Sequence, residues 1–113
     1  SSGVTIFVGR GGEDNDRTTF GHAKPYELWF HTAQCPGSHV VMKFPDKNFV
    51  PSKQEITEAA AVAAFHSKAK NAKAVPVIYT ERRFVRKPRG AKPGLVTVER
   101  EKMVMVVPRE GKG

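Results

Sequence analysis

The sequence predicts a single α+β domain, in which one long helix and a short second helix pack on a mostly antiparallel β-sheet. The main observation is the order of the expected elements: a strand, a short helix, a β-hairpin, a long helix and then several strands. A chain of 113 residues is long enough for one modest hydrophobic core. We therefore treat residues 1–113 as one domain.

The first elements are a strand and a weak helix. Residues 4–9, VTIFVG, are β-branched and aromatic, which is typical of a strand. After a Gly-Gly break, residues 14–23 predict a short helix with Asp14 or Asn15 as its N-cap. Lys24-Pro25 ends this helix.

A hairpin is expected next, formed by residues 28–32 and 39–44. Pro36-Gly37 suits a type II turn, because proline fixes φ and glycine accepts a positive φ. A register that pairs Phe30 with Val40 places Trp29 opposite Val41 and His31 opposite His39. One face of the hairpin is then apolar, and the other presents Trp29, His31, His39 and Lys43.

The long helix is predicted from about Ser52 to about Asn71. Ser52 and Glu55 have the spacing of a capping box. The body that follows is rich in alanine and carries Ile56, Val62 and Phe65, which suits close packing against a sheet. Strands are then expected over residues 75–80, 84–85, 95–98 and 103–107.

The positive charge is concentrated in the second half of the chain. The net charge is +8 and the isoelectric point is about 9.9. Residues 1–60 contain six Lys or Arg and seven Asp or Glu, whereas residues 61–113 contain thirteen and four. Residues 82–94, RRFVRKPRGAKPG, hold six basic residues and no acidic one. This asymmetry favours a nucleic acid over a membrane as partner, although a solvated basic surface would look the same.

The cysteine and histidines do not predict a metal site or a catalytic thiol. His31, Cys35 and His39 are spaced by four, but Pro36-Gly37 cannot continue a helix, so they do not share a helix face. No pair of ligands has the close spacing of a zinc motif. We expect no metal, no cofactor and no catalytic residue. A single cysteine fits a reducing compartment, and we expect the cytoplasm, with an organelle as the alternative.

The candidate RNA-binding residues form two groups and one isolated position. Trp29, His31 and His39 have two readings, as core residues or as part of an RNA-contacting face with Lys43. The second group is the set of basic residues within residues 82–94. They can bind phosphates through their side chains, and the backbone near the glycines can approach phosphates closely. The full candidate set is Arg10, Trp29, His31, His39, Lys43, Arg82, Arg83, Arg86, Lys87, Arg89 and Lys92.

Several stretches together resemble one known family. They are SSGVTIFVGR, NDRTTFGHA, ELWFHTAQCPGSHVV, EAAAVAAFHSKAK, VPVIYT and VRKPRGAKPG. In this order they resemble the NFACT-R domain, the RNA-binding module of NFACT proteins, over nearly all of residues 1–108. Glu27 and Thr18 depart from the family pattern, which often has Asp and Leu there.

The resemblance implies a non-catalytic domain that works in ribosome-associated quality control. The expected partners are tRNA, ribosomal RNA and, within a full NFACT protein, the large ribosomal subunit carrying a stalled chain. The alternative is a protein-interaction domain or an enzyme whose basic surface is incidental.

Overall fold

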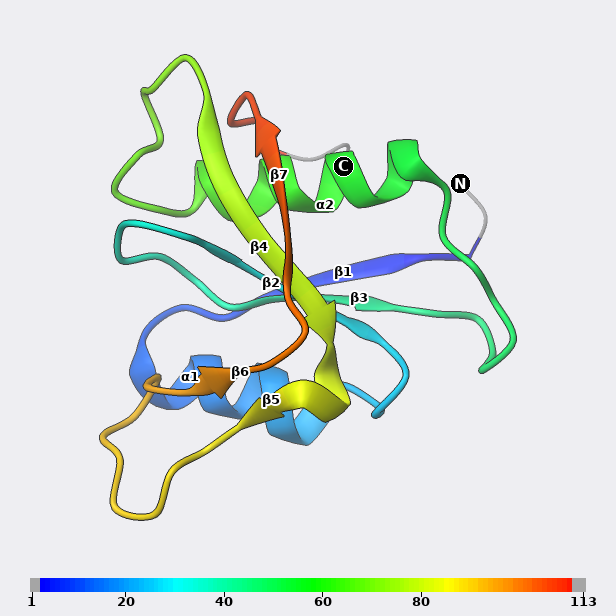
Figure 1. Cartoon of the computed structure of the whole chain (residues 1–113), viewed down its shortest axis with the longest axis vertical. Helices are drawn as coiled ribbons and strands as arrows, with labels where there is room; N and C mark the ends of the chain where they lie inside the picture. The colour runs from blue at the N-terminus through cyan, green and yellow to red at the C-terminus, as the bar shows by residue number, and fades with distance from the viewer. Residues whose placement is uncertain (1–2, 111–113) are drawn as a thin grey trace.

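A five-stranded antiparallel sheet forms the centre of the fold in the computed structural model, which describes residues 3–110 (Figure 1). The strand order is β1-β3-β2-β4-β7. The five strands are β1 (Thr5–Val8), β2 (Leu28–Thr32), β3 (Val40–Lys43), β4 (Val75–Glu81) and β7 (Lys102–Val106). The predicted α+β fold with a mostly antiparallel sheet is therefore confirmed.

Helix α2 (Lys53–Phe65) covers one face of the sheet (Figure 1). The predicted capping box is present: Glu55 N–H donates to Ser52 Oγ at 3.0 Å, and Ser52 N–H donates to Glu55 Oε1 at 2.8 Å. Its six consecutive residues from Ala59 to Ala64 are buried, so the small side chains allow the helix to approach the sheet closely.

The predicted C-terminal end of this helix, Asn71, is wrong, because α2 ends at Phe65. The segment after it bonds to the β2–β3 connection instead of continuing the helix. Ser38 N–H donates to the carbonyl oxygen of His66, and Lys68 N–H donates to that of Pro36, both at 3.0 Å. These bonds satisfy backbone groups that a longer helix would have used internally.

The same contacts correct the predicted turn at Pro36-Gly37. Gly37 does not have the positive φ of a type II turn, and it forms an antiparallel bridge with Ser67. A Cβ at Gly37 would lie 2.9 Å from Ser67 Cβ, so glycine is needed here for close approach. The predicted strand register is nevertheless confirmed, with Phe30 opposite Val40 and Trp29 opposite Val41.

A second layer lies on the other face of the sheet (Figure 1). It consists of α1 (Gly12–Asp16), the π-helix η1 (Arg17–His22), the 3₁₀-helix η2 (Arg82–Phe84) and the two-stranded sheet of β5 (Val85–Arg86) and β6 (Thr97–Val98). The predicted N-caps Asp14 and Asn15 are wrong. The helix begins at Gly12, and its N-cap, Gly11, makes no side-chain bond.

Because both faces of the sheet are covered, the fold has two hydrophobic clusters. Phe30, Val40 and Met42 point toward α2. Trp29, Val41 and Val85 form the cluster beneath the second layer. Successive side chains of β2 therefore point alternately into the cluster under α2 and into the cluster under the second layer, and neither face of the strand points to solvent. None of the helices within residues 3–110 has the length and apolar character needed to cross a membrane.

Candidate nucleic-acid interface

The segment from Lys87 to Leu95, here called the basic loop, is built from two consecutive turns. Ala91 N–H donates to the carbonyl oxygen of Pro88 at 3.0 Å, and Leu95 N–H donates to that of Lys92 at 3.1 Å. The third residue of each turn is glycine, with φ of 75° at Gly90 and 85° at Gly94. Positive φ at this position is the mark of a type II turn. The spacing of Pro and Gly in KPRGAKPG thus encodes an ordered loop.

Lys87 and Asp16 fasten the base of this loop to α1. The Lys87 ammonium group donates to the carbonyl oxygens of Lys92 and Leu95 and pairs with Asp16 Oδ2 at 3.0 Å. The other carboxylate oxygen of Asp16 accepts a bond from Gly94 N–H at 3.1 Å. Lys87 was predicted to contact RNA, but the structure shows that much of its bonding capacity is used within the protein.

His39 holds the same loop from beneath. Its Nε2 lies 3.1 Å from the carbonyl oxygen of Gly94, and its Nδ1 lies 2.8 Å from Thr19 Oγ1. Because a carbonyl can only accept, Nε2 carries the proton and Nδ1 accepts from the Thr19 hydroxyl. Burial, followed by the nearby His31 imidazole, lowers the pKa of His39 to about 4. His39 is therefore neutral near pH 7.

Trp29, His31 and His39 form a ring cluster that lies mainly in the core. His31 stacks on Trp29 with 5.9 Å between ring centroids, and His39 meets Trp29 edge-on at 5.2 Å. Trp29 and His39 are each 2% exposed, whereas His31 is half-buried. Of the two readings, burial favours the core reading for Trp29 and His39, because neither ring is accessible to stack on a base.

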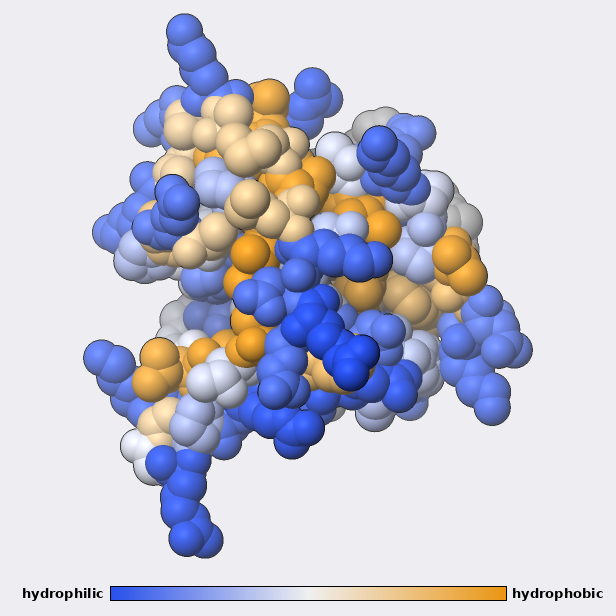
Figure 2. All heavy atoms as spheres, in the orientation of Figure 1, coloured by the Kyte–Doolittle hydropathy of each residue, from blue (hydrophilic) through white to orange (hydrophobic). Residues whose placement is uncertain are grey.

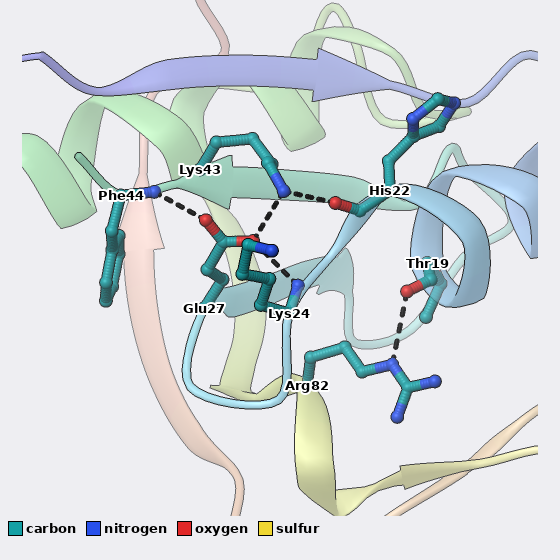
Figure 3. A network of polar contacts seen from close by, with 7 residues as sticks. All are labelled: Thr19, His22, Lys24, Glu27, Lys43, Phe44 and Arg82. Carbon is teal, nitrogen blue, oxygen red and sulfur yellow. Dashed lines mark hydrogen bonds and ion pairs between the residues drawn. The ribbon is translucent and has the colours of Figure 1, made fainter. Parts of the chain in front are cut away.

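Lys43 lies on the predicted face, but it is paired with the buried carboxylate of Glu27 (Figure 3). Glu27 is fully buried and accepts bonds from Lys43 Nζ at 2.8 Å and from the backbone N–H groups of Lys24 and Phe44 at 2.7 Å. Lys43 Nζ also donates to the carbonyl oxygen of His22. The bonds from Lys43 therefore support a structural role, and Glu27 satisfies three donors despite being longer than the usual Asp.

The arginines at the start of the cluster differ in their freedom. Arg82 Nε donates to the carbonyl oxygen of Thr19 at 3.2 Å, and its guanidinium lies 4.7 Å from the centre of the Phe20 ring (Figure 3). Burial lowers its pKa below the usual value. Arg83 pairs closely with Glu81, at 2.6 Å. Arg86 is exposed, and its pair with Glu99 is long, at 3.9 Å.

Three of the predicted residues are exposed and make no ion pair within residues 3–110: Arg10, Arg89 and Lys92. Arg89 lies in the first turn of the basic loop, and Lys92 begins the second turn. With the exposed Arg86 at its base, the loop presents three cations to solvent. Backbone bonds and the contacts from Lys87 and His39 order this loop, so the backbone that carries its cations is fixed before a ligand arrives.

No local signal identifies the residues that hold the loop. Asp16 and Thr19 lie in the first quarter of the chain. Asp16 accepts a bond from Gly94, 78 positions later, and Thr19 bonds to His39, 20 positions later, which in turn contacts Gly94. No local spacing connects them to the loop. Among the described residues, no group of three His, Cys, Asp or Glu could hold a metal ion, and Cys35 is a half-buried free thiol.

The fold and the ordered basic loop define a small, basic α+β domain of the kind that binds polyanions. Residues 1–100 match the family model described as the NFACT protein RNA binding domain. The chain belongs to this family.

Relatives and a solved structure agree with this assignment. The chain is 45% identical over 108 residues to the Rqc2 homolog RqcH of Bacillus subtilis, and 44% identical over 107 residues to that of Streptococcus suis. These matches cover 96% and 95% of this chain but only 18% and 19% of the relatives. The solved C-terminal part of the fibronectin/fibrinogen-binding protein from Streptococcus suis superposes with a TM-score of 0.87 at 42% identity, covering 95% of this chain and 42% of that one.

Proposed function

We propose that this domain is a non-catalytic RNA-binding module that binds tRNA, ribosomal RNA or both in ribosome-associated quality control. In this proposal it acts in the cytoplasm, on a large ribosomal subunit that carries a stalled chain. Membership of a family of RNA-binding domains and relatives named RqcH support this role. The observation that carries it is the ordered basic loop, which presents Arg86, Arg89 and Lys92 to solvent.

The proposed mode of binding is contact with RNA phosphates. Fixed cations beside exposed backbone suit a regular array of phosphates, and such contacts position an RNA without reading its sequence. Arg10 and Arg83 are also exposed and are further candidates for phosphate contact in this proposal, with Arg83 paired to Glu81 in the free domain. Trp29, His39 and Lys43 act indirectly in this proposal, through the core and through the contacts that hold the loop.

The test is the salt dependence of binding to purified tRNA and to ribosomal RNA. With about four to six phosphate contacts, the logarithm of the binding constant should fall with the logarithm of the salt concentration, with a slope of about −3 to −5. Changing Arg86, Arg89 and Lys92 to Gln together should flatten the slope by about two to three units. Thermal unfolding should change little, because exposed charges contribute little to folding.

A matched control removes the same charge from the side of the molecule that carries α2. Lys47, Lys53 and Arg109 are exposed, and changing them to Gln lowers the net charge equally. We expect this variant to change the slope by less than about one unit, through long-range electrostatics alone. Equal slopes in both triple variants would contradict the assignment of the basic loop as the contact surface.

A further inference from the structure

Two methionines of β7 lie exposed on the outer face of the sheet. Met103 is 62% exposed and Met105 is 57% exposed. In the register of β4 and β7, Met103 is opposite Ile78 and Met105 is opposite Pro76. Paired residues of antiparallel strands point to the same face, so these four side chains share the face opposite to α2. Figure 2 shows a band of hydrophobic atoms in this region, beside strongly hydrophilic atoms.

This apolar surface continues to the basic loop. On the next strand, His31 is opposite Ile78 and is half-buried. Leu95, which is 50% exposed, directly follows Gly94, and the adjacent Val96 joins Ile78 in the cluster around Trp29. We call the whole surface the outer strip; it consists of His31, Pro76, Ile78, Leu95, Met103 and Met105.

The second layer leaves the β7 side of the outer strip, with Met103 and Met105, uncovered. The cluster beneath α1, η1, β5 and β6 includes Ile78, but not Met103 or Met105. Met103 and Met105 lie on the same face as Pro76 and Ile78, so they form a contiguous apolar patch rather than scattered single residues, and contiguous apolar patches often mark binding surfaces.

The charges beside the strip favour an anionic occupant. Lys92 and Arg89 lie on the basic loop, which contributes Leu95 to the strip itself. At the start of β7, the exposed Arg100 is held with its guanidinium 5.3 Å from the centre of the Phe84 ring. Glu99 faces Arg86 at 3.9 Å, which leaves Glu101 as the acidic residue next to β7 without an ion pair in the described chain.

We propose that the outer strip binds unpaired bases of an RNA whose phosphates lie on the basic loop. This inference rests on the proposed function and narrows its ligand to RNA with a single-stranded element. An apolar surface beside cations on an ordered loop suits a single strand of RNA whose bases are splayed away from its sugar-phosphate backbone. A duplex hides the faces of its bases and can use only the cations. His31 is the one aromatic ring in the strip, and the methionines supply flexible apolar area.

A first experiment compares a single-stranded RNA of about ten nucleotides with a duplex of the same sequence. We expect Met103→Ser together with Met105→Ser to weaken binding of the single strand by about fivefold or more. Binding of the duplex and the salt slope of both RNAs should stay the same, because no charge is removed. Val50→Ser is the control, since Val50 is 83% exposed and lies in the segment before α2.

A second experiment uses the unaltered protein. Hydrogen peroxide oxidises exposed methionines to sulfoxides, and mass spectrometry can follow each of the three methionines. Met42 is fully buried and serves as the internal reference. The single-stranded RNA should slow oxidation of Met103 and Met105 severalfold, whereas the duplex should not.

The outcomes separate this inference from the proposed function. Salt-dependent binding that is insensitive to the methionine substitutions, or equal protection by both RNAs, overturns the strip as a base-binding site and leaves the basic loop in place. If the strip instead binds a protein partner, RNA binding should likewise be insensitive to the methionine substitutions. No salt-dependent binding of either RNA would overturn the proposed function as well.

Discussion

The Nε2–H group of His39 donates a hydrogen bond to the carbonyl oxygen of Gly94, 55 positions later in the chain, at 3.1 Å. This bond joins the start of β3 to the second turn of the basic loop. It depends on a neutral imidazole whose other nitrogen accepts from Thr19. The position of the loop is therefore linked to the protonation of a buried side chain.

We expect His39 to make the stability depend on pH. Its pKa is about 4 in the folded protein and about 6.5 when unfolded, so the unfolded chain binds more protons between these values. The stabilising contribution is complete above pH 6.5 and is lost as the pH falls toward 4. The difference amounts to roughly 3 kcal/mol. Urea unfolding at several pH values, with His39→Gln as the variant, would measure it.

His39→Gln removes this titration, so its unfolding free energy should vary less between pH 6.5 and pH 4 than that of the unaltered protein. Burial also lowers the pKa of His31, so part of the dependence should remain. His22 is exposed, and His22→Gln should keep the full dependence. A parallel pH profile in His39→Gln would contradict the expectation.

Lys87→Met should loosen the basic loop without unfolding the domain. The substitution removes the ion pair with Asp16 and the bonds to the carbonyl oxygens of Lys92 and Leu95. We expect a loss of about 1 kcal/mol in stability and faster amide hydrogen exchange at Ala91 and Leu95. Asp16→Asn should give a similar pattern. Unchanged exchange at both amides in Lys87→Met would show that the turns alone order the loop.

Trp29→Ala should destabilise the domain by about 3–5 kcal/mol, because the indole fills the cluster beneath the second layer. Unfolding by denaturant would measure this, with Val50→Ala as an exposed control that we expect to change stability by less than about 0.5 kcal/mol. Retained stability combined with a loss of RNA affinity would instead place the ring at the interface.

Glu27→Asp should weaken the attachment of the segment before β2 to the end of β3. The shorter side chain cannot keep all three bonds to Lys24, Lys43 and Phe44 without a shift of the backbone. A loss of about 1–3 kcal/mol is expected, since a buried donor would lose its partner. Glu58→Asp is the control, because Glu58 is exposed on α2. Equal unfolding free energies for the two variants would mean that the backbone adapts.

Local signals in the sequence were sufficient for the elements whose causes are local. The Ser52–Glu55 capping box, the alternation along β2 and β3 and the Pro-Gly spacing of the basic loop all act within a few residues. Two of the errors, the end of α2 and the exposure of Trp29, have non-local causes. The end of α2 depends on the bridge between Gly37 and Ser67, and the burial of Trp29 depends on a second layer drawn from both ends of the chain.

The same non-locality limited the prediction of the site. Charge density identified the segment from Arg82 to Lys92, but not which of its cations are free. Arg82 and Lys87 are tied by Thr19 and Asp16, which are distant in sequence. Arg89 and Lys92 remain exposed because the turns that carry them project from the body.

Gly90 lies at the open tip of the basic loop, so we expect trypsin to cleave the Arg89–Gly90 peptide bond. A Cβ at Gly90 would meet no atom within 4 Å, so the bond is sterically accessible. The chain on each side of such a nick stays paired, through β5 with β6 and through β4 with β7. Cleavage should therefore yield two fragments that remain associated, and their reassembly from separate peptides would report directly on the strength of those pairings.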